Sequence, residues 1–97
     1  MDIHKENAQV LHLVQAMLGG ITPNFRAVFL KCNPDGVDLN FLLQHESEED
    51  REEIEDIVFE FEALQLSGID VEVSVSVDTR PLDELRLSGR MIYARRE

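Results

Sequence analysis

The spacing of hydrophobic residues switches along the chain between the period of a helix and that of a strand. Residues 7–18 show the first helical pattern, and the Gly19-Gly20 pair marks its end, because glycine readily adopts the left-handed conformation that follows many helices. The apolar positions that share this broad stripe, with Ile21 just after it, are Val10, Leu11, Leu13, Val14, Met17 and Leu18. We therefore expect one helix here that buries a single wide face.

Two strands joined by a tight turn are predicted next. Residues 25–32 and 37–44 are rich in strand-forming side chains, and residues 33–36 between them read Asn-Pro-Asp-Gly. Proline presets the second position of a type I turn, and Gly36 can take the positive φ of the bulge that closes a hairpin. The two segments are therefore expected to pair as an antiparallel hairpin.

That turn implies a register in which Asn33 faces Val37 and Phe29 faces Phe41. Alternation along each strand then separates two faces of the hairpin. One face is plainly apolar and comprises Phe25, Ala27, Phe29, Val37, Leu39, Phe41 and Leu43. The other face is mixed, and its apolar members form a candidate contact surface: Val28, Leu30 and Leu42.

The second helix has a well-marked start. Ser47 can cap the free amides of the first turn, and Asp50 occupies the reciprocal position of a capping box. The hydrophobic positions at helical spacing, which should pack on the sheet, are Ile54, Ile57, Val58, Phe61 and Leu64. Phe59 lies outside that stripe, and Ser67-Gly68 ends the pattern.

Two more strands are predicted in the last third of the chain. Residues 69–78 alternate without error, so the odd positions should face a core and the even positions solvent or a polar partner. Pro81 blocks central pairing within residues 78–89, where we expect a loop with one helical turn. The final strand is predicted over residues 90–95.

The predicted order is helix, strand, strand, helix, strand, strand. Two helical stripes and the apolar faces of two hairpins are buried most simply in a two-layer α+β sandwich, a four-stranded antiparallel sheet with both helices on one face. Residues 1–97 are expected to form a single domain, because a chain of 97 residues buries enough surface for one modest core. The order of strands within the sheet does not follow from the sequence.

Composition narrows the class of partner. The chain has nine Lys and Arg against twenty Asp and Glu, a formal net charge of -11, and it lacks the basic stripe that phosphate recognition needs. We therefore expect no nucleic acid, and the charge suits a cationic partner. No run approaches the roughly twenty apolar residues of a membrane helix, and the start of the chain lacks the pattern of a secretory signal. The cytoplasm is the expected compartment.

Most of the negative charge lies in one segment. Residues 46–62 carry ten acidic residues and one basic residue, Arg51, for a net charge of -9. Like charges at three- and four-residue spacing destabilise an isolated helix by roughly a few tenths of a kcal/mol per pair. That these residues are present despite this cost indicates that the acidic surface has a function, such as binding a partner. The simpler alternative is a solvated helix face that keeps the protein soluble.

Catalytic and metal-binding signatures are poor. The paired glycines end a helix rather than following a strand, so they do not form a phosphate-binding loop. His4 and His12 lack the usual spacing of metal ligands, and Cys32 and His45 fall at distant points of the predicted hairpin. The single cysteine also excludes an internal disulfide. We expect no enzyme, no metal and no cofactor.

The most distinctive stretch is residues 46–57, Glu-Ser-Glu-Glu-Asp-Arg-Glu-Glu-Ile-Glu-Asp-Ile, followed by Phe-Glu-Phe-Glu at residues 59–62. In this stretch, and in size, acidity and element order, the whole chain resembles the small immunity proteins of bacterial toxin–immunity systems, especially those directed against contact-dependent growth inhibition or other polymorphic toxins. These proteins share no universal motif, so no residue role carries over from them. The resemblance implies a cytoplasmic protein that binds the toxin domain of its own system, often a basic nuclease, and blocks its active site or substrate groove.

The charge pattern is compatible with that role. An acidic surface accelerates encounter with a basic toxin, and apolar anchors inside a polar rim retain it. Carboxylates would steer the toxin and pair with its arginines, with Phe59 as the candidate anchor. The residues expected to bind the partner are Glu48, Glu49, Glu52, Glu53, Asp56, Phe59 and Glu60. The protein is expected to be a monomer or a weak dimer.

Two other functions stay open. Small acidic α+β dimers also act as secretion chaperones for effector segments, and the mixed hairpin face of Val28, Leu30 and Leu42 would then be the dimer or effector surface. A regulatory binding subunit with no toxin is the third alternative. Light scattering separates the first two, because a stable dimer that binds an extended peptide favours the chaperone.

Overall fold

The helices and strands follow one another in the predicted order. The computed structural model describes residues 3–66 and 68–97. The elements are the helices α1 (Ile3–Met17) and α2 (Glu48–Ala63), the strands β1 (Phe25–Cys32), β2 (Gly36–Leu43), β3 (Asp70–Val77) and β4 (Arg90–Ala94), and a short 3-10 helix, η1 (Leu82–Glu84). The α+β class, the element order and the helical turn before the last strand are therefore confirmed.

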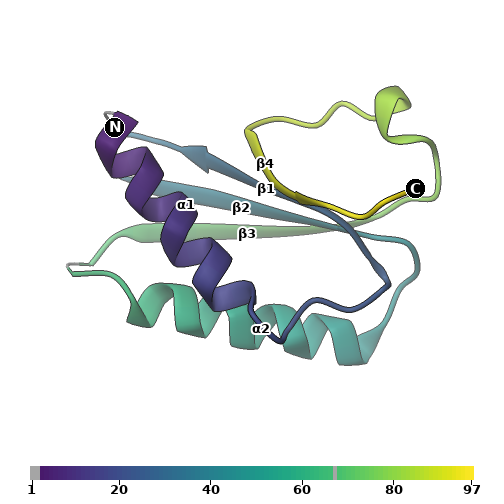
Figure 1. Ribbon diagram of the computed structural model, residues 1–97, viewed down its shortest axis with the longest axis horizontal. Coiled ribbons are helices and arrows are strands. Elements are labelled where there is room, and N and C mark those ends of the chain that lie inside the picture. The colour runs from purple at the N-terminus through teal and green to yellow at the C-terminus, as the bar shows by residue number, and fades with distance from the viewer. Residues whose placement is uncertain (1–2, 67) are drawn as a thin grey trace.

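The sheet is mixed, which corrects the antiparallel sheet expected from the sequence. Its strand order is β3-β2-β1-β4, and β1 pairs antiparallel with both β2 and β4, but β2 pairs parallel with β3. The cause is the connection between β2 and β3, because a helical crossover returns the chain to the sheet in its original direction. α2 is this crossover; in Figure 1 it runs along the β3 side of the sheet while α1 crosses in front of the strands.

The register of the hairpin differs from the predicted one by one residue. Cys32, rather than Asn33, lies opposite Val37. Residues 33–35 connect the two strands, and the amide of Asn33 donates to the carbonyl of Gly36 at 2.8 Å. Gly36 does not adopt a positive φ. The register is therefore shifted by one residue from the predicted one, and such a shift turns the side chains of a strand to the opposite face.

Val28 and Leu30 consequently lie under the helices, whereas Ala27 and Phe29 face the other side of the sheet. A bulge next to Arg26 restores Phe25 to the helix side. The main core lies between the helices and the sheet, and its buried residues are Leu13, Ala16, Met17, Phe25, Val28, Leu30, Val37, Leu39, Phe41, Leu43, Ile54, Ile57 and Phe61. Both helices therefore cover one face of the sheet, as predicted.

A second, smaller apolar cluster lies on the opposite face of the sheet. The loop between β3 and β4 covers it with three leucines, Leu82, Leu85 and Leu87. Beneath them are the buried residues Ala27, Phe29 and Leu42. This loop therefore closes a face that a two-layer domain would otherwise leave open to water.

Gly36 lies where β3 begins beside β2. A Cβ at Gly36 would stand 1.9 Å from the carbonyl oxygen of Asp70, which is far inside van der Waals contact. Only glycine therefore lets the two parallel strands approach at this point. The residue that the sequence assigned to turn conformation serves strand pairing instead.

The start of α2 is capped as predicted but uses Asp50 differently. The hydroxyl of Ser47 accepts from the backbone amide of Asp50 at 3.2 Å. The Asp50 carboxylate, predicted to complete a capping box, instead accepts from the hydroxyl of Thr22 at 2.9 Å and from the side-chain amide of Asn24 at 2.8 Å. Asp50 thus ties the connection after α1 to the first turn of α2.

The helix ends differ from the predicted bounds by a few residues. α1 begins at Ile3, and Gly19 has a φ of 81°, the left-handed conformation expected after a helix end. α2 ends at Ala63. Ser67, part of the predicted stop, lies outside the described residues.

Candidate functional site

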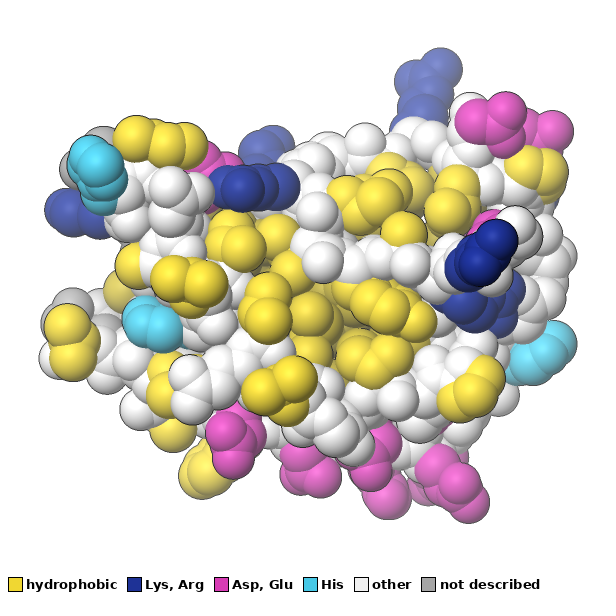
Figure 2. Space-filling model, viewed as in Figure 1, with side chains coloured by type: hydrophobic (Ala, Val, Ile, Leu, Met, Phe, Trp, Pro, Cys, Tyr) yellow, Lys and Arg dark blue, Asp and Glu magenta, His cyan; other side chains and the backbone are white. Residues whose placement is uncertain are grey.

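α2 carries its acidic residues on the side that faces away from the sheet. Its inner side is set by Ile54, Ile57 and Phe61, all buried in the main core, so the intervening positions of the helix point outward. Of the seven predicted partner-binding residues, Glu53 is half-buried and the others are exposed: Glu48, Glu49, Glu52, Asp56, Phe59 and Glu60. Figure 2 shows the acidic side chains along the lower edge of the molecule.

The predicted residues form two groups on this helix, a groove group described next and an outer group that does not line the groove. The outer group is Glu48, Glu49, Glu52 and Phe59. Glu53, Asp56 and Glu60 line a groove of about 260 Å³ between α2 and the end of α1. The other walls of the groove are Gln15, Ala16, Leu18, Gly19, Gly20 and Ile57. Phe59 belongs to the outer group, since it lies about 160° around the helix from the buried Phe61 at 100° per residue, and its side chain is 74% exposed.

The carboxylates of this surface are not neutralised by the protein's own cations. None of the predicted acidic residues forms an ion pair within residues 3–66 and 68–97. Arg51, the one cation of the segment, pairs with Glu46, and its hydrogen bonds hold the pKa of that carboxyl below its usual value. The outer side of α2 therefore presents a negative field that is available to a cationic partner.

The alternative contact surface on the hairpin is wrong. Val28 and Leu30 are fully buried beneath the helices, and Leu42 is 2% exposed beneath the β3–β4 loop. The one-residue register shift is the physical reason, because it separates these side chains onto two covered faces. The chaperone alternative loses the surface on which it depended.

A second exposed surface was missed by the sequence analysis. Three apolar side chains of α1 and that of Leu18, which directly follows the helix, are here called the α1 apolar face. They are 58%, 68%, 42% and 76% exposed: Ile3, Leu11, Val14 and Leu18. Three of them had been assigned to the buried stripe of this helix. The sequence did contain a sign of this surface, which is the absence of charge. Residues 7–25 contain no Asp, Glu, Lys or Arg, whereas the solvent-facing side of a surface helix usually carries such residues.

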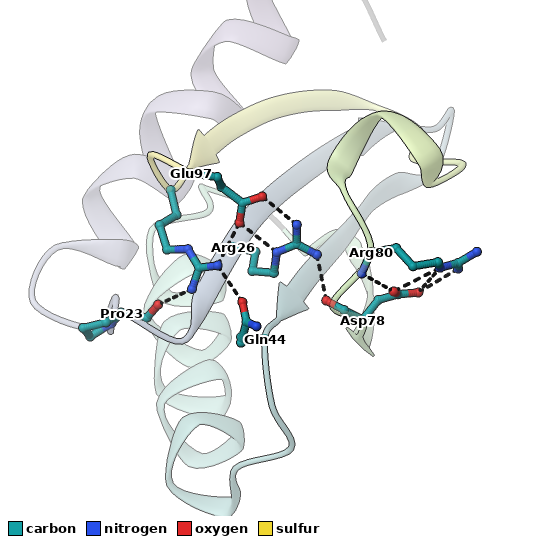
Figure 3. Close-up of polar contacts among 7 residues, drawn as sticks. Pro23, Arg26, Gln44, Asp78, Arg80 and Glu97 are labelled. Carbon is teal, nitrogen blue, oxygen red and sulfur yellow. Dashed lines mark hydrogen bonds and ion pairs between the residues drawn. The ribbon is translucent and has the colours of Figure 1, made fainter.

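Arg26 on β1 and Arg95 after β4 hold the last residue, Glu97, against the sheet. Arg26, which is 2% exposed, donates to both carboxylate oxygens of Glu97 at 2.8 and 2.6 Å and to the carbonyl of Asp78 at 2.7 Å, as Figure 3 shows. Arg95 adds a hydrogen bond to Glu97 at 2.8 Å. Because these contacts join β1 to the residues after β3 and β4, the network is structural.

This network predicts acid sensitivity. Hydrogen bonds from Arg26, and then from Arg95, lower the pKa of Glu97 from 4.5 to about 2. The folded pKa lies below the unfolded one, so the carboxylate stabilises the fold above pH 4.5 and loses this effect as the pH falls toward about 2. We expect Glu97→Gln to lower the Tm near neutral pH, with a difference from wild type that vanishes near pH 2.

Circular dichroism melts across that pH range measure the effect. Glu72→Gln, which changes an exposed carboxylate on β3, is the matched control and should follow wild type throughout. A Tm difference between Glu97→Gln and wild type that stays constant with pH would contradict the prediction.

The residues considered for chemistry do not come together. Cys32 lies at the turn end of the β1–β2 hairpin and His45 follows its other end, and burial raises the pKa of the Cys32 thiol. His4 and His12 both lie on α1, eight residues apart. Within residues 3–66 and 68–97, no three His, Cys, Asp or Glu side chains are grouped so that they could hold a metal ion. Neither described helix is long and apolar enough to cross a membrane.

An acidic helix face whose predicted contact carboxylates form no ion pair with the described residues, near an exposed apolar helix face, is typical of a protein that binds another protein. Comparison with known families identifies which kind of protein-binding protein this is. Residues 6–97 match a family model described as MafI2 immunity protein. Because the match covers most of the chain, the chain belongs to the MafI2 immunity protein family, and the resemblance to immunity proteins is confirmed. No curated protein matches the chain.

The family gives the general function. Membership of an immunity protein family implies binding of a cognate toxin, which points to a role in binding rather than in catalysis. The family does not say which surface of this chain binds the toxin. The candidates are the surfaces described above.

Proposed function

We propose that this protein neutralises its toxin by laying the outer side of α2 into the toxin's active site or substrate groove, and that the toxin domain is a basic nuclease of a polymorphic or contact-dependent system. The encounter is proposed to take place in the cytoplasm. The observation that carries the proposal is the set of α2 carboxylates that have no ion-pair partner within residues 3–66 and 68–97.

The spacing of these carboxylates supports a nuclease as the target. Glu48, Glu52, Asp56 and Glu60 recur every four residues, so they form a row about 18 Å long at 1.5 Å per residue. A nuclease groove must carry positive charge because it binds a regular row of phosphates. A helix with carboxylates at regular spacing offers the same sign of charge in a similar linear arrangement, so it can occupy such a groove in place of the nucleic acid.

Phe59 supplies the apolar part of the same surface. Its side chain is 74% exposed in the middle of the acidic side of α2 and is not needed for the core. An exposed aromatic ring surrounded by polar side chains is the usual form of a binding anchor, because the surrounding groups exclude water once the ring is buried in a partner. The acids would therefore guide encounter, and Phe59 would contribute to retention.

Charge reversal tests the proposal. Changing Glu49, Glu52, Glu53 and Asp56 together to lysine should leave the fold intact, because none of them is buried. The association rate with the toxin domain encoded beside this protein's gene should fall by about tenfold or more at low ionic strength, and the loss should shrink as salt is added. Stopped-flow or surface-binding kinetics at several salt concentrations measure this.

The matched control makes the same change in net charge elsewhere. Asp70, Glu72, Asp83 and Glu84 are exposed acidic residues outside α2, and their replacement by lysine should slow association far less. Equal slowing by the two variants, or no change in the first, would remove α2 from the mechanism. A stoichiometric complex in which the toxin keeps its nuclease activity would overturn the proposed blocking of the active site.

A further inference from the structure

The α1 apolar face is an ordered surface rather than a scatter of exposed residues. Ile3, Leu11 and Val14 fall within about 80° of one another at 100° per residue, and extending the period by one residue past α1 brings Leu18 into the same range. This side is away from the buried Leu13 and Ala16. A surface helix normally opposes its buried stripe with polar side chains, whereas α1 is apolar on two sides. Figure 2 shows hydrophobic side chains gathered over α1 and the neighbouring sheet, with the acidic edge of α2 below them.

From this arrangement we infer that the α1 apolar face is a second part of the toxin-binding surface, and that it sets how slowly the complex dissociates. The inference rests on the proposed function and adds to it that the two helices act on different rates. The acidic side of α2 speeds association, and the α1 apolar face slows dissociation. The occupant is an apolar segment of the toxin domain that is bordered by Lys or Arg side chains.

The border of this face specifies the charge of its occupant. Leu18, the most exposed member at 76%, also lines the groove that contains Glu53, Asp56 and Glu60. An apolar segment that covers Leu18 therefore brings its own flanking residues next to these carboxylates. Basic flanking residues would pair with them, whereas acidic ones would meet like charge in a partly desolvated site, which disfavours binding.

The same charges oppose a second copy of this chain as the occupant. Two copies that met through α1 would bring together two chains of formal net charge -11. Each would place residues 46–62, of net charge -9, close to the contact, because the groove joins α1 to α2. Like-charge juxtaposition suppresses such pairing, so the face fits a basic partner better than a copy of itself.

Dissociation kinetics test the inference without changing the net charge. We would replace Leu11, Val14 and Leu18 together with serine, since these side chains are exposed and the fold does not need them. With the toxin domain encoded beside the gene as the probe, the dissociation rate should rise by about tenfold or more, while the association rate and its salt dependence stay close to wild type. A thermal melt confirms that the variant is folded.

The matched control changes three apolar residues that are exposed elsewhere, Leu66, Val73 and Met91, to serine, and should leave the dissociation rate unchanged. If the α1 variant dissociates no faster than wild type, the inference is overturned and the proposed function stands. If wild type does not bind this toxin domain, the proposed function itself fails. Light scattering of the free protein should show a monomer, and a dimer that the α1 variant disrupts would assign the face to a second copy and overturn the inference.

Discussion

Replacing Phe61 with alanine is expected to lower the free energy of unfolding by about 3–5 kcal/mol, whereas replacing Phe59 with alanine should change it by less than about 0.5 kcal/mol. The two residues are only two positions apart on α2, but Phe61 is fully buried in the main core and Phe59 is 74% exposed. For a domain of this size, the larger change corresponds to a fall in Tm of more than about 10 °C.

Urea unfolding of both variants measures the difference, with Phe61→Leu as a milder variant that keeps much of the buried volume. Phe59→Ala should instead weaken binding of the toxin domain while the unfolding curve stays that of wild type. Equal destabilisation by the two alanine variants would mean that α2 does not bury the face described here. Unchanged toxin affinity in Phe59→Ala would remove this ring from the proposed contact surface.

Replacing Leu30 with glutamate should prevent folding, while Lys31→Glu should leave the protein folded. Leu30 is 0% exposed and lies under the helices, so a carboxylate there would be buried without a partner, which a domain of this size cannot tolerate. Lys31 is exposed on the other face of the sheet. Expression, circular dichroism and thermal melts distinguish the two outcomes.

This pair of variants also tests the hairpin register directly. In the register predicted from the sequence, Lys31 would share the core face with Phe29, and Leu30 would lie on the mixed face. The structure reverses these positions. A folded Leu30→Glu protein together with an unfolded Lys31→Glu protein would therefore support the sequence-based register over the one described here.

The features that the sequence predicted correctly are those with local causes. Helix starts and stops depend on residues next to them in the chain, such as Ser47 and Gly19, and the outer residues of α2 follow from its period once Ile54 and Phe61 are placed inside. The element order and the exposed acidic side could therefore be predicted from single segments.

The features that the sequence did not predict depend on contacts between distant segments. Whether β3 runs parallel to β2 depends on how α2 crosses the sheet, and the register depends on one residue of turn length near Gly36. The α1 apolar face was missed for a related reason. Periodicity identifies apolar positions on a helix, but it does not show how many of them the rest of the protein covers. Leu11 in α1 and Leu18 just after it remain exposed.

The division of α2 between an inner and an outer side has a consequence for how this protein can evolve. Its inner side and its Ser47 cap are committed to the fold, whereas the predicted contact residues make no ion pair within residues 3–66 and 68–97. Substitutions at such exposed positions usually change stability by less than about 0.5 kcal/mol. On the proposed function, in which these residues contact the toxin, the lineage could alter its specificity one residue at a time, with each intermediate still a folded protein.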